Sequence, residues 1–219
     1  MALGLIAFSL IFFLSDRPLW DIIGQIAWNV NTNIVLVAIP LFLLMGEILL
    51  RSGLTERLYD TLSKWLNPLP GGLMHTNIAA CATFAAVSGS SVATAATISA
   101  VALPTFRAKG YSERLVIGSL AAGGTLGILI PPSINMIVYG VLVEESIGRL
   151  YIGGVFPGIL MALSFMGIIL LAALLWPKVA PKERGAPWKD RLLSLVSMLP
   201  VAALIFLVLG TIYIGVATP

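Results

Sequence analysis

Residues 73–106 read LMHTNIAACATFAAV-SGSS-VATAATISAVALPTF, two apolar arms of 15 residues each joined by the uncharged tip Ser88-Gly89-Ser90-Ser91. Because a helix rises about 1.5 Å per residue, each arm covers only about 22 Å, less than the roughly 30 Å hydrocarbon core of a bilayer. An aqueous loop would usually carry charge, whereas a small polar tip is typical of a re-entrant hairpin that turns inside the protein. Two thin complete spans remain the alternative interpretation.

The tip has the chemistry of a binding site. The ends of the two arms leave backbone groups unpaired. The N-terminus of the second arm carries partial positive charge, which suits a carboxylate. The last carbonyls of the first arm and the serine hydroxyls suit a small hard cation, and Gly89 permits the sharp turn. The alternative is that the small residues serve only close helix packing.

A second polar interruption lies inside the apolar stretch 115–143, where residues 123–135 read GGTLGILIPPSIN. Since neither proline has a backbone N–H, the carbonyls of Gly127 and Ile128 lose their helical donors. The helix is therefore expected to unwind near Pro131-Pro132. Unwound backbone at membrane depth is tolerated where it lines a cavity, so the double proline favours a site over a simple kink. A hairpin tip that meets a broken helix is the layout of a transporter with inverted repeats.

The composition limits the class of protein. Hydrophobic residues make up 58% of the 219 residues and charged residues 11%, against about 25% in a typical soluble domain. A soluble enzyme is excluded, and no paired acid and base is visible. The net charge of +3 is too small and scattered for a nucleic-acid surface. A single cysteine, Cys81, excludes a disulfide framework.

The charges predict how the chain is organised in the membrane. The loop 177–191 has five basic and two acidic residues, which the positive-inside rule places in the cytoplasm. The amphipathic segment 51–66 is expected to lie in the membrane interface. Glu47 is the sole acid well inside a span, so it is either a functional carboxylate or the partner of Arg51.

Four regions are expected along the chain. Residues 1–72 form scaffold spans and an interfacial helix, and residues 73–149 form a transport-type region. Residues 150–191 form a span and a cytoplasmic loop, and residues 192–219 open a further span.

Along nearly its whole length the chain resembles the large membrane subunit of TRAP (tripartite ATP-independent periplasmic) transporters, the DctM-like subunit. The resemblance rests on AIPLF at 38–42, GE at 46–47, SGSSVA at 88–93, IPPSI at 130–134, YGV at 139–141 and SIGRL at 146–150. Asn135 stands where the family commonly has proline.

The resemblance implies an all-α polytopic membrane protein that forms one repeat of an inverted-repeat, elevator-type transporter. The re-entrant hairpin would be residues 73–106 and the broken helix residues 115–143. Because the family's large subunit is about twice as long, the chain is expected to be its N-terminal half. Residues 192–219 would then be the truncated start of the second repeat, and residues 51–66 an arm helix along the membrane.

The same resemblance implies a function. The chain would belong to a sodium-coupled importer of organic acids, such as C4-dicarboxylates or sialic acid, in the bacterial inner membrane. A periplasmic binding protein would deliver the substrate, and a small membrane subunit would pack beside the chain in the lipid bilayer. The alternatives are an anion or sodium permease of the same broad group that needs no binding protein, and a membrane fragment that serves assembly only. No nucleic-acid partner is expected.

The implied site joins the hairpin tip to the helix break. Na+ is the expected coupling ion, and no other metal or cofactor is expected. The residues expected to bind sodium are Ser88, Gly89, Ser90, Ser91, Gly127 and Ile128. The residues expected to lie near the substrate are Ser91, Thr94, Pro131, Pro132, Ser133 and Asn135.

Overall fold

The computed structural model describes residues 2–14, 20–177, 181 and 185–216, and all regular elements within these residues are helices. The chain divides into two compact units, Met1–Val37 and Ala38–Pro219. The first unit contains α1 (Ala2–Leu14), α2 (Trp20–Asn31) and the short 3-10 helix η1 (Ile34–Val37). The Oδ1 atom of Asn33 accepts a hydrogen bond of 3.0 Å from the backbone N–H of Val35, which stabilises the start of η1.

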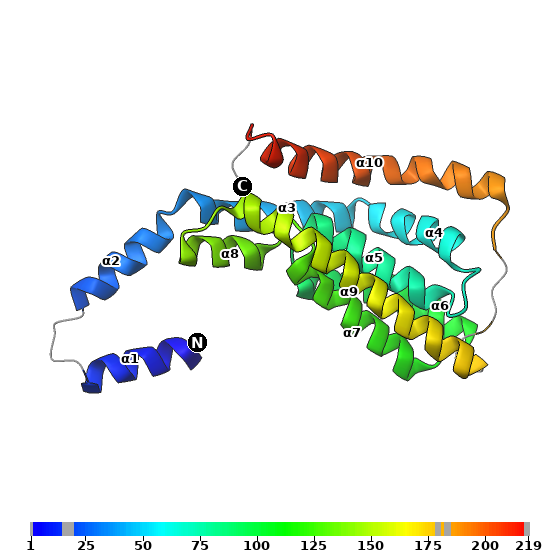
Figure 1. Cartoon of the computed structure of the whole chain (residues 1–219), viewed down its shortest axis with the longest axis horizontal. Helices are drawn as coiled ribbons and strands as arrows, with labels where there is room; N and C mark the ends of the chain where they lie inside the picture. The colour runs from blue at the N-terminus through cyan, green and yellow to red at the C-terminus, as the bar shows by residue number, and fades with distance from the viewer. Residues whose placement is uncertain (1, 15–19, 178–180, 182–184, 217–219) are drawn as a thin grey trace. The chain divides into compact units, whose positions relative to one another are not determined.

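The second unit holds the remaining helices and all of the predicted site. These helices are α3 (Ala38–Arg51), α4 (Leu54–Leu66), α5 (Leu73–Ser88), α6 (Ser91–Lys109), α7 (Glu113–Leu129), α8 (Ile134–Val143), α9 (Ile147–Leu175) and α10 (Trp188–Tyr213). Figure 1 shows α5, α6, α7 and α9 packed together, with α4 beside α5 and α10 beside α4.

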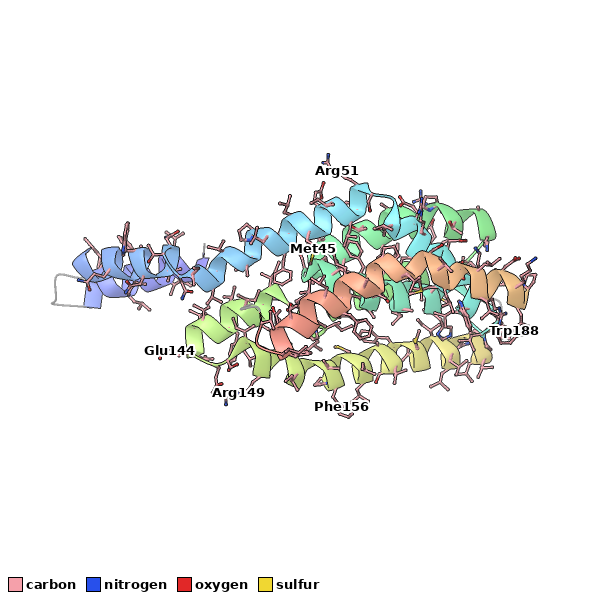
Figure 2. All side chains as sticks on the ribbon, turned by 90° about the horizontal axis from the view of Figure 1, so that it is seen from above. Met45, Arg51, Glu144, Arg149, Phe156 and Trp188 are labelled. Atoms are coloured by element: carbon pink, nitrogen blue, oxygen red, sulfur yellow. The ribbon has the colours of Figure 1, made fainter. Side chains whose placement is uncertain are left out.

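Within the described part of the chain, four segments are long and apolar enough to cross a membrane: Ile34–Arg51, Glu113–Val143, Ile147–Leu175 and Trp188–Tyr213. Their outer faces keep large apolar side chains exposed, and Figure 2 shows Phe156 projecting outward from α9. A soluble protein rarely exposes apolar surface on this scale, whereas lipid covers it in a membrane. The described helices thus confirm the prediction of an all-α, multi-pass membrane protein.

The chain reverses between α5 and α6 within two residues. Gly89 has a φ angle of 61°, in the left-handed region that favours glycine, and its N–H donates to the carbonyl of Ala85 at 3.0 Å. Ser90 is extended, and its Oγ accepts a hydrogen bond of 3.3 Å from the N–H of Ala93. Residues 73–109 therefore form a tight helical hairpin, and its re-entrant placement in a membrane stays a prediction.

The hydrophobic core lies where α5 packs against α6 and α7. Ile78, Ile98 and Leu126 are completely buried there. Cys81 is also buried, and a methyl group added to Gly123 would lie 2.8 Å from its Sγ. The glycine allows α7 to approach α5 closely, so the position of α7 depends on its small residues.

A buried polar chain ties α4 to the hairpin and to α7. The hydroxyl of Tyr59 donates to Oδ1 of Asn77 at 2.9 Å, and Nδ2 of Asn77 donates to Oγ of Ser119 at 3.0 Å. On its other side, Oγ1 of Thr61 donates to the carbonyl of Ser194 at 3.1 Å. Thus α4 runs beside the first half of α10, itself a candidate span. The placement of residues 51–66 in the membrane interface stays a prediction.

Candidate functional site

Four helix ends meet at the tip of the hairpin. The carbonyl of Gly89, which follows α5, accepts a hydrogen bond of 3.0 Å from the N–H of Ile134, the first residue of α8. The last turn of α7 packs on the first residue of α6, since a methyl group on Gly127 would lie only 2.8 Å from the backbone N of Ser91. The negative ends of α5 and α7 and the positive ends of α6 and α8 therefore converge.

The prolines explain why α7 ends at this place. The last helical hydrogen bond of α7 runs from the N–H of Ile130 to the carbonyl of Leu126, at 2.9 Å. The carbonyls of Gly127 and Ile128 have no helical donor, because residues 131 and 132 are both prolines. Two backbone oxygens beside the hairpin tip are thus left without their usual partners.

Hydroxyl groups supply further oxygen atoms. Oγ of Ser88 and Oγ1 of Thr94 share a hydrogen bond of 2.9 Å inside the hairpin, and both residues are buried. Ser133 precedes α8 and is also buried, but its Oγ has no hydrogen-bond partner in the described part of the chain. A buried hydroxyl without a partner is unusual in a native protein, and binding sites are one of the places where it occurs.

The structure brings most of the predicted site residues together. Gly89 lies against Pro132 and Ile134, and Ser90 and Ser91 lie against Gly127. Ser88 bonds Thr94 inside the same hairpin. Pro131, Pro132 and Ser133 are buried at the break. Asn135 is exposed on α8, and the side chain of Ile128 is 42% exposed. Because that side chain is apolar, Ile128 offers only its carbonyl to a cation.

Several residues of this region were not among the predicted ones. The backbone N–H of Ile134 bonds the tip. A methyl group on Gly46 of α3 would lie 3.3 Å from Ser88, and one on Gly124 of α7 would lie 2.7 Å from Cβ of Ala95. The glycine-rich run in α7 was a signal for such close packing.

Tyr151 of α9 is another residue that the sequence did not single out. Its side chain is completely buried, and its hydroxyl has no hydrogen-bond partner in the described part of the chain. A single tyrosine near the end of a span resembles the aromatic belt of membrane proteins, so its position in the sequence gave no signal that its side chain would be buried.

An open groove leads away from the tip between α6 and α7. It has a volume of about 570 Å³ and begins at Ser91. Small and apolar side chains line most of it, and hydroxyl groups come from Ser91, Ser99 and Thr125. The groove brings the tip within reach of a molecule that lies along this face.

Glu47 is placed as the partner of Arg51. Its Oε1 accepts a hydrogen bond of 2.7 Å from Nε of Arg51, and the side chain of Glu47 is 49% exposed. Figure 2 shows Arg51 projecting away from the helices. This geometry favours a surface ion pair over a buried functional carboxylate.

Comparison with known proteins identifies relatives of the whole chain. Residues 1–219 match the family described as "Tripartite ATP-independent periplasmic transporter, DctM component". The chain is 38% identical to the C4-dicarboxylate TRAP transporter large permease protein DctM of Pseudomonas aeruginosa, over 88% of this chain and 44% of that protein. It is 36% identical to the isethionate TRAP transporter permease protein DctMQ of Oleidesulfovibrio alaskensis, over 100% of this chain and 34% of the relative. It is 32% identical to the sialic acid TRAP transporter permease protein SiaT of Haemophilus influenzae, over 82% of this chain and 28% of that protein.

These relatives are named as permeases and not as enzymes. The chain spans less than half the length of each of the three relatives. The family match covers every residue, including the hairpin tip and the helix break. The chain belongs to the DctM family of TRAP transporter membrane components.

Proposed function

We propose that the chain is part of a sodium-coupled TRAP permease that imports an organic acid across the bacterial inner membrane. A periplasmic binding protein delivers the acid, and a small membrane subunit packs beside the permease. The family match and the apolar helices support the membrane assignment. The observation that carries the proposal is the convergence of four helix ends, joined by the 3.0 Å hydrogen bond between Gly89 and Ile134.

The proposed sodium site lies between the hairpin tip and the end of α7. The C-terminal ends of α5 and α7 carry partial negative charge, and the carbonyls of Gly127 and Ile128 lack helical donors. Ser88 ends α5 and Ser91 begins α6, so the tip carries a hydroxyl group at each of these two helix ends. Neutral carbonyl and hydroxyl oxygens suit Na+, and unwound backbone supplies such ligands in secondary transporters.

The proposed substrate group is a carboxylate held near the N-termini of α6 and α8. Both N-termini carry partial positive charge. Ser133, whose hydroxyl has no partner among the described residues, lies directly before α8, and Ser91 opens α6. Three relatives are named for C4-dicarboxylate, sialic acid and 2,3-diketo-L-gulonate, all of which carry a carboxylate. Thr94 bonds Ser88, so we assign it to holding the tip rather than to direct substrate contact.

We further propose that α5 and α6 form a re-entrant hairpin within one repeat of an elevator-type transporter. The 16 residues of α5 cover about 24 Å, which is shorter than a bilayer core of roughly 30 Å. In this arrangement the tip and the break in α7–α8 would move together, because Gly89 and Ile134 join them.

The experiment uses the full-length permease with its small subunit and binding protein, reconstituted in proteoliposomes. Uptake of a labelled organic acid is measured with an inward sodium gradient and with a matched potassium gradient. The proposal expects sodium-dependent uptake that falls at least about tenfold when Ser91→Ala is combined with Pro131→Ala. The first change removes a hydroxyl group from the tip, and the second restores a backbone N–H that can bond the carbonyl of Gly127. Ser164→Ala, on an exposed face of α9, is the control and should transport normally. Unchanged uptake in the double variant would overturn the sodium assignment, and uptake without any binding protein would favour the independent permease.

A further inference from the structure

An aromatic and cationic cluster lies where the end of α4 meets the start of α10. The rings of Trp65 and Trp188 pack edge to face, with centroids 6.2 Å apart and planes at 85°. The guanidinium carbon of Arg191 lies 5.2 Å from the centroid of the Trp188 ring, in a cation–π arrangement. Figure 2 shows Trp188 at the end of the second unit opposite to Glu144 and Arg149. The cluster is separate from the candidate transport site.

Two N–H donors of this cluster have no acceptor among the described residues. Within the described residues, Arg191 forms no ion pair, and its Nε donates no hydrogen bond. The indole Nε1 of Trp65 is likewise shielded from solvent and has no partner there. Donors that have left water without finding an acceptor cost free energy, so these two N–H groups are available to an oxygen that does not belong to the described residues.

The guanidinium group is held in a defined slot. A methyl group on Gly185 would contact a terminal nitrogen of Arg191 and would lie 2.9 Å from Cγ of Pro68. Trp188 closes another side of the group. A planar guanidinium in a fixed orientation can bind the oxygens of a phosphate in pairs, which a lysine ammonium cannot do.

An apolar stripe begins at the same cluster and follows α10. It consists of Trp188, Leu192, Leu195 and Leu199, which recur at helical spacing and are 68%, 59%, 42% and 61% exposed. At about 1.5 Å per residue the stripe is about 16 Å long, half of a hydrocarbon core of roughly 30 Å. Its length therefore matches the acyl chains of one leaflet.

We propose that the junction of α4 and α10 binds an anionic phospholipid. Arg191 holds the phosphate, the two tryptophans lie at the level of the headgroup, and the acyl chains follow the stripe on α10. A lipid is favoured over free phosphate because the cationic slot and the apolar stripe are continuous on one helix. Because the loop 177–191 is basic, we place the bound lipid in the cytoplasmic leaflet, whose anionic lipids attract basic segments.

Lipid binding to the purified full chain in detergent is measured by native mass spectrometry, with phosphatidylglycerol and phosphatidylcholine titrated separately. The proposal expects one tightly bound phosphatidylglycerol and weaker phosphatidylcholine. Arg191→Gln should lower the phosphatidylglycerol affinity at least about fivefold, because it removes the guanidinium group that holds the phosphate. Lys189→Gln removes the same charge from an exposed neighbouring position and should change the affinity less than about twofold.

Three outcomes would overturn the proposal. Equal affinity for both lipids would show that the site does not distinguish between the two headgroups. Equal losses in the Arg191 and Lys189 variants would show general attraction instead of a site. Thermal stabilisation by inorganic phosphate equal to that by phosphatidylglycerol would assign the slot to a free anion.

Arg191→Lys serves as the second variant if Arg191→Gln does not fold, which circular dichroism and size-exclusion chromatography report. The lysine keeps the positive charge but cannot stack on Trp188 or bind two phosphate oxygens at once. The variant should therefore lose at least about half of the affinity for phosphatidylglycerol. Full affinity in a folded Arg191→Lys variant would contradict the role of the planar guanidinium.

Discussion

The contact between Gly127 and the hairpin tip gives the sharpest test of the fold around the site. A methyl group on Gly127 would lie 2.8 Å from N and 2.9 Å from Cα of Ser91, and 2.9 Å from the carbonyl carbon of Ser90. All three are backbone atoms, so no flexible side chain can move aside. Gly118 lies on the same helix, and a methyl group there would meet no atom within 4 Å. Gly118→Ala is therefore the matched control for Gly127→Ala.

The magnitude follows from two opposing terms. Alanine is favoured over glycine inside a helix by about 1 kcal/mol, and this gain applies to both variants. Overpacking against rigid atoms costs about 1–3 kcal/mol, and this cost applies only at Gly127. The propensity term cancels in the comparison, so Gly127→Ala should be about 1–3 kcal/mol less stable than Gly118→Ala.

The assay is unfolding of each purified variant in the same detergent, followed by far-ultraviolet circular dichroism. For a chain of this size, about 2–4 °C of Tm corresponds to 1 kcal/mol, so the Tm of Gly127→Ala should lie several degrees below that of Gly118→Ala. Equal Tm values for the two variants would refute the close contact between α7 and the tip, and with it the geometry of the candidate site.

Three further predictions concern the same unit and are measured by the same unfolding assay. Ser88→Ala leaves the buried hydroxyl of Thr94 without its partner and should lower the free energy of unfolding by about 1–3 kcal/mol. The double variant with Thr94→Val should lose less stability than the sum of the two single variants, and strict additivity would contradict the hydrogen bond between them. Gly89→Ala should destabilise the fold more than Gly110→Ala does. Both glycines have positive φ angles, but only a methyl group at Gly89 would lie 2.8 Å from a carbonyl oxygen, that of Pro132. Equal losses of stability would count against the contact between the hairpin tip and the helix break. Tyr59→Phe removes the donor to the buried amide of Asn77 and should cost about 1–2 kcal/mol; no loss would show that the polar chain does not hold α4.

The local breaks in this fold could be predicted from the sequence because they depend on the chemistry of single residues. Gly89 adopts the positive φ angle that the SGSS tip suggested, and α7 ends two residues before Pro131. A missing N–H or a missing Cβ acts wherever the chain lies, so no tertiary information is needed. The predicted arms 73–87 and 92–106 differ from α5 and α6 by only a few residues at their ends.

The contacts that assemble the site could not be derived in the same way. The hydrogen bond between Gly89 and Ile134 joins residues 45 positions apart, and neither residue type announces it. The packing of α4 beside α5 and α10 depends on Tyr59 and Thr61, whose partners lie on other helices. Hydrophobic spacing indicates which face of α4 is apolar but not which helices cover it. Tyr151 was overlooked because a tyrosine near the end of a span is typical of the aromatic belt, so nothing in the sequence marked it as buried.

The most direct test of the central claim is equilibrium binding of radioactive sodium to the purified chain. The joint site of hairpin tip and helix break predicts saturable binding that weakens at least about tenfold when Ser88 and Ser91 are both replaced by alanine, since each lost oxygen ligand removes a favourable contact worth about 1 kcal/mol or more. Ser164→Ala, whose hydroxyl bonds the carbonyl of Leu160 on exposed α9, should bind sodium normally. Equal sodium affinity in the tip variant and the control would contradict the account.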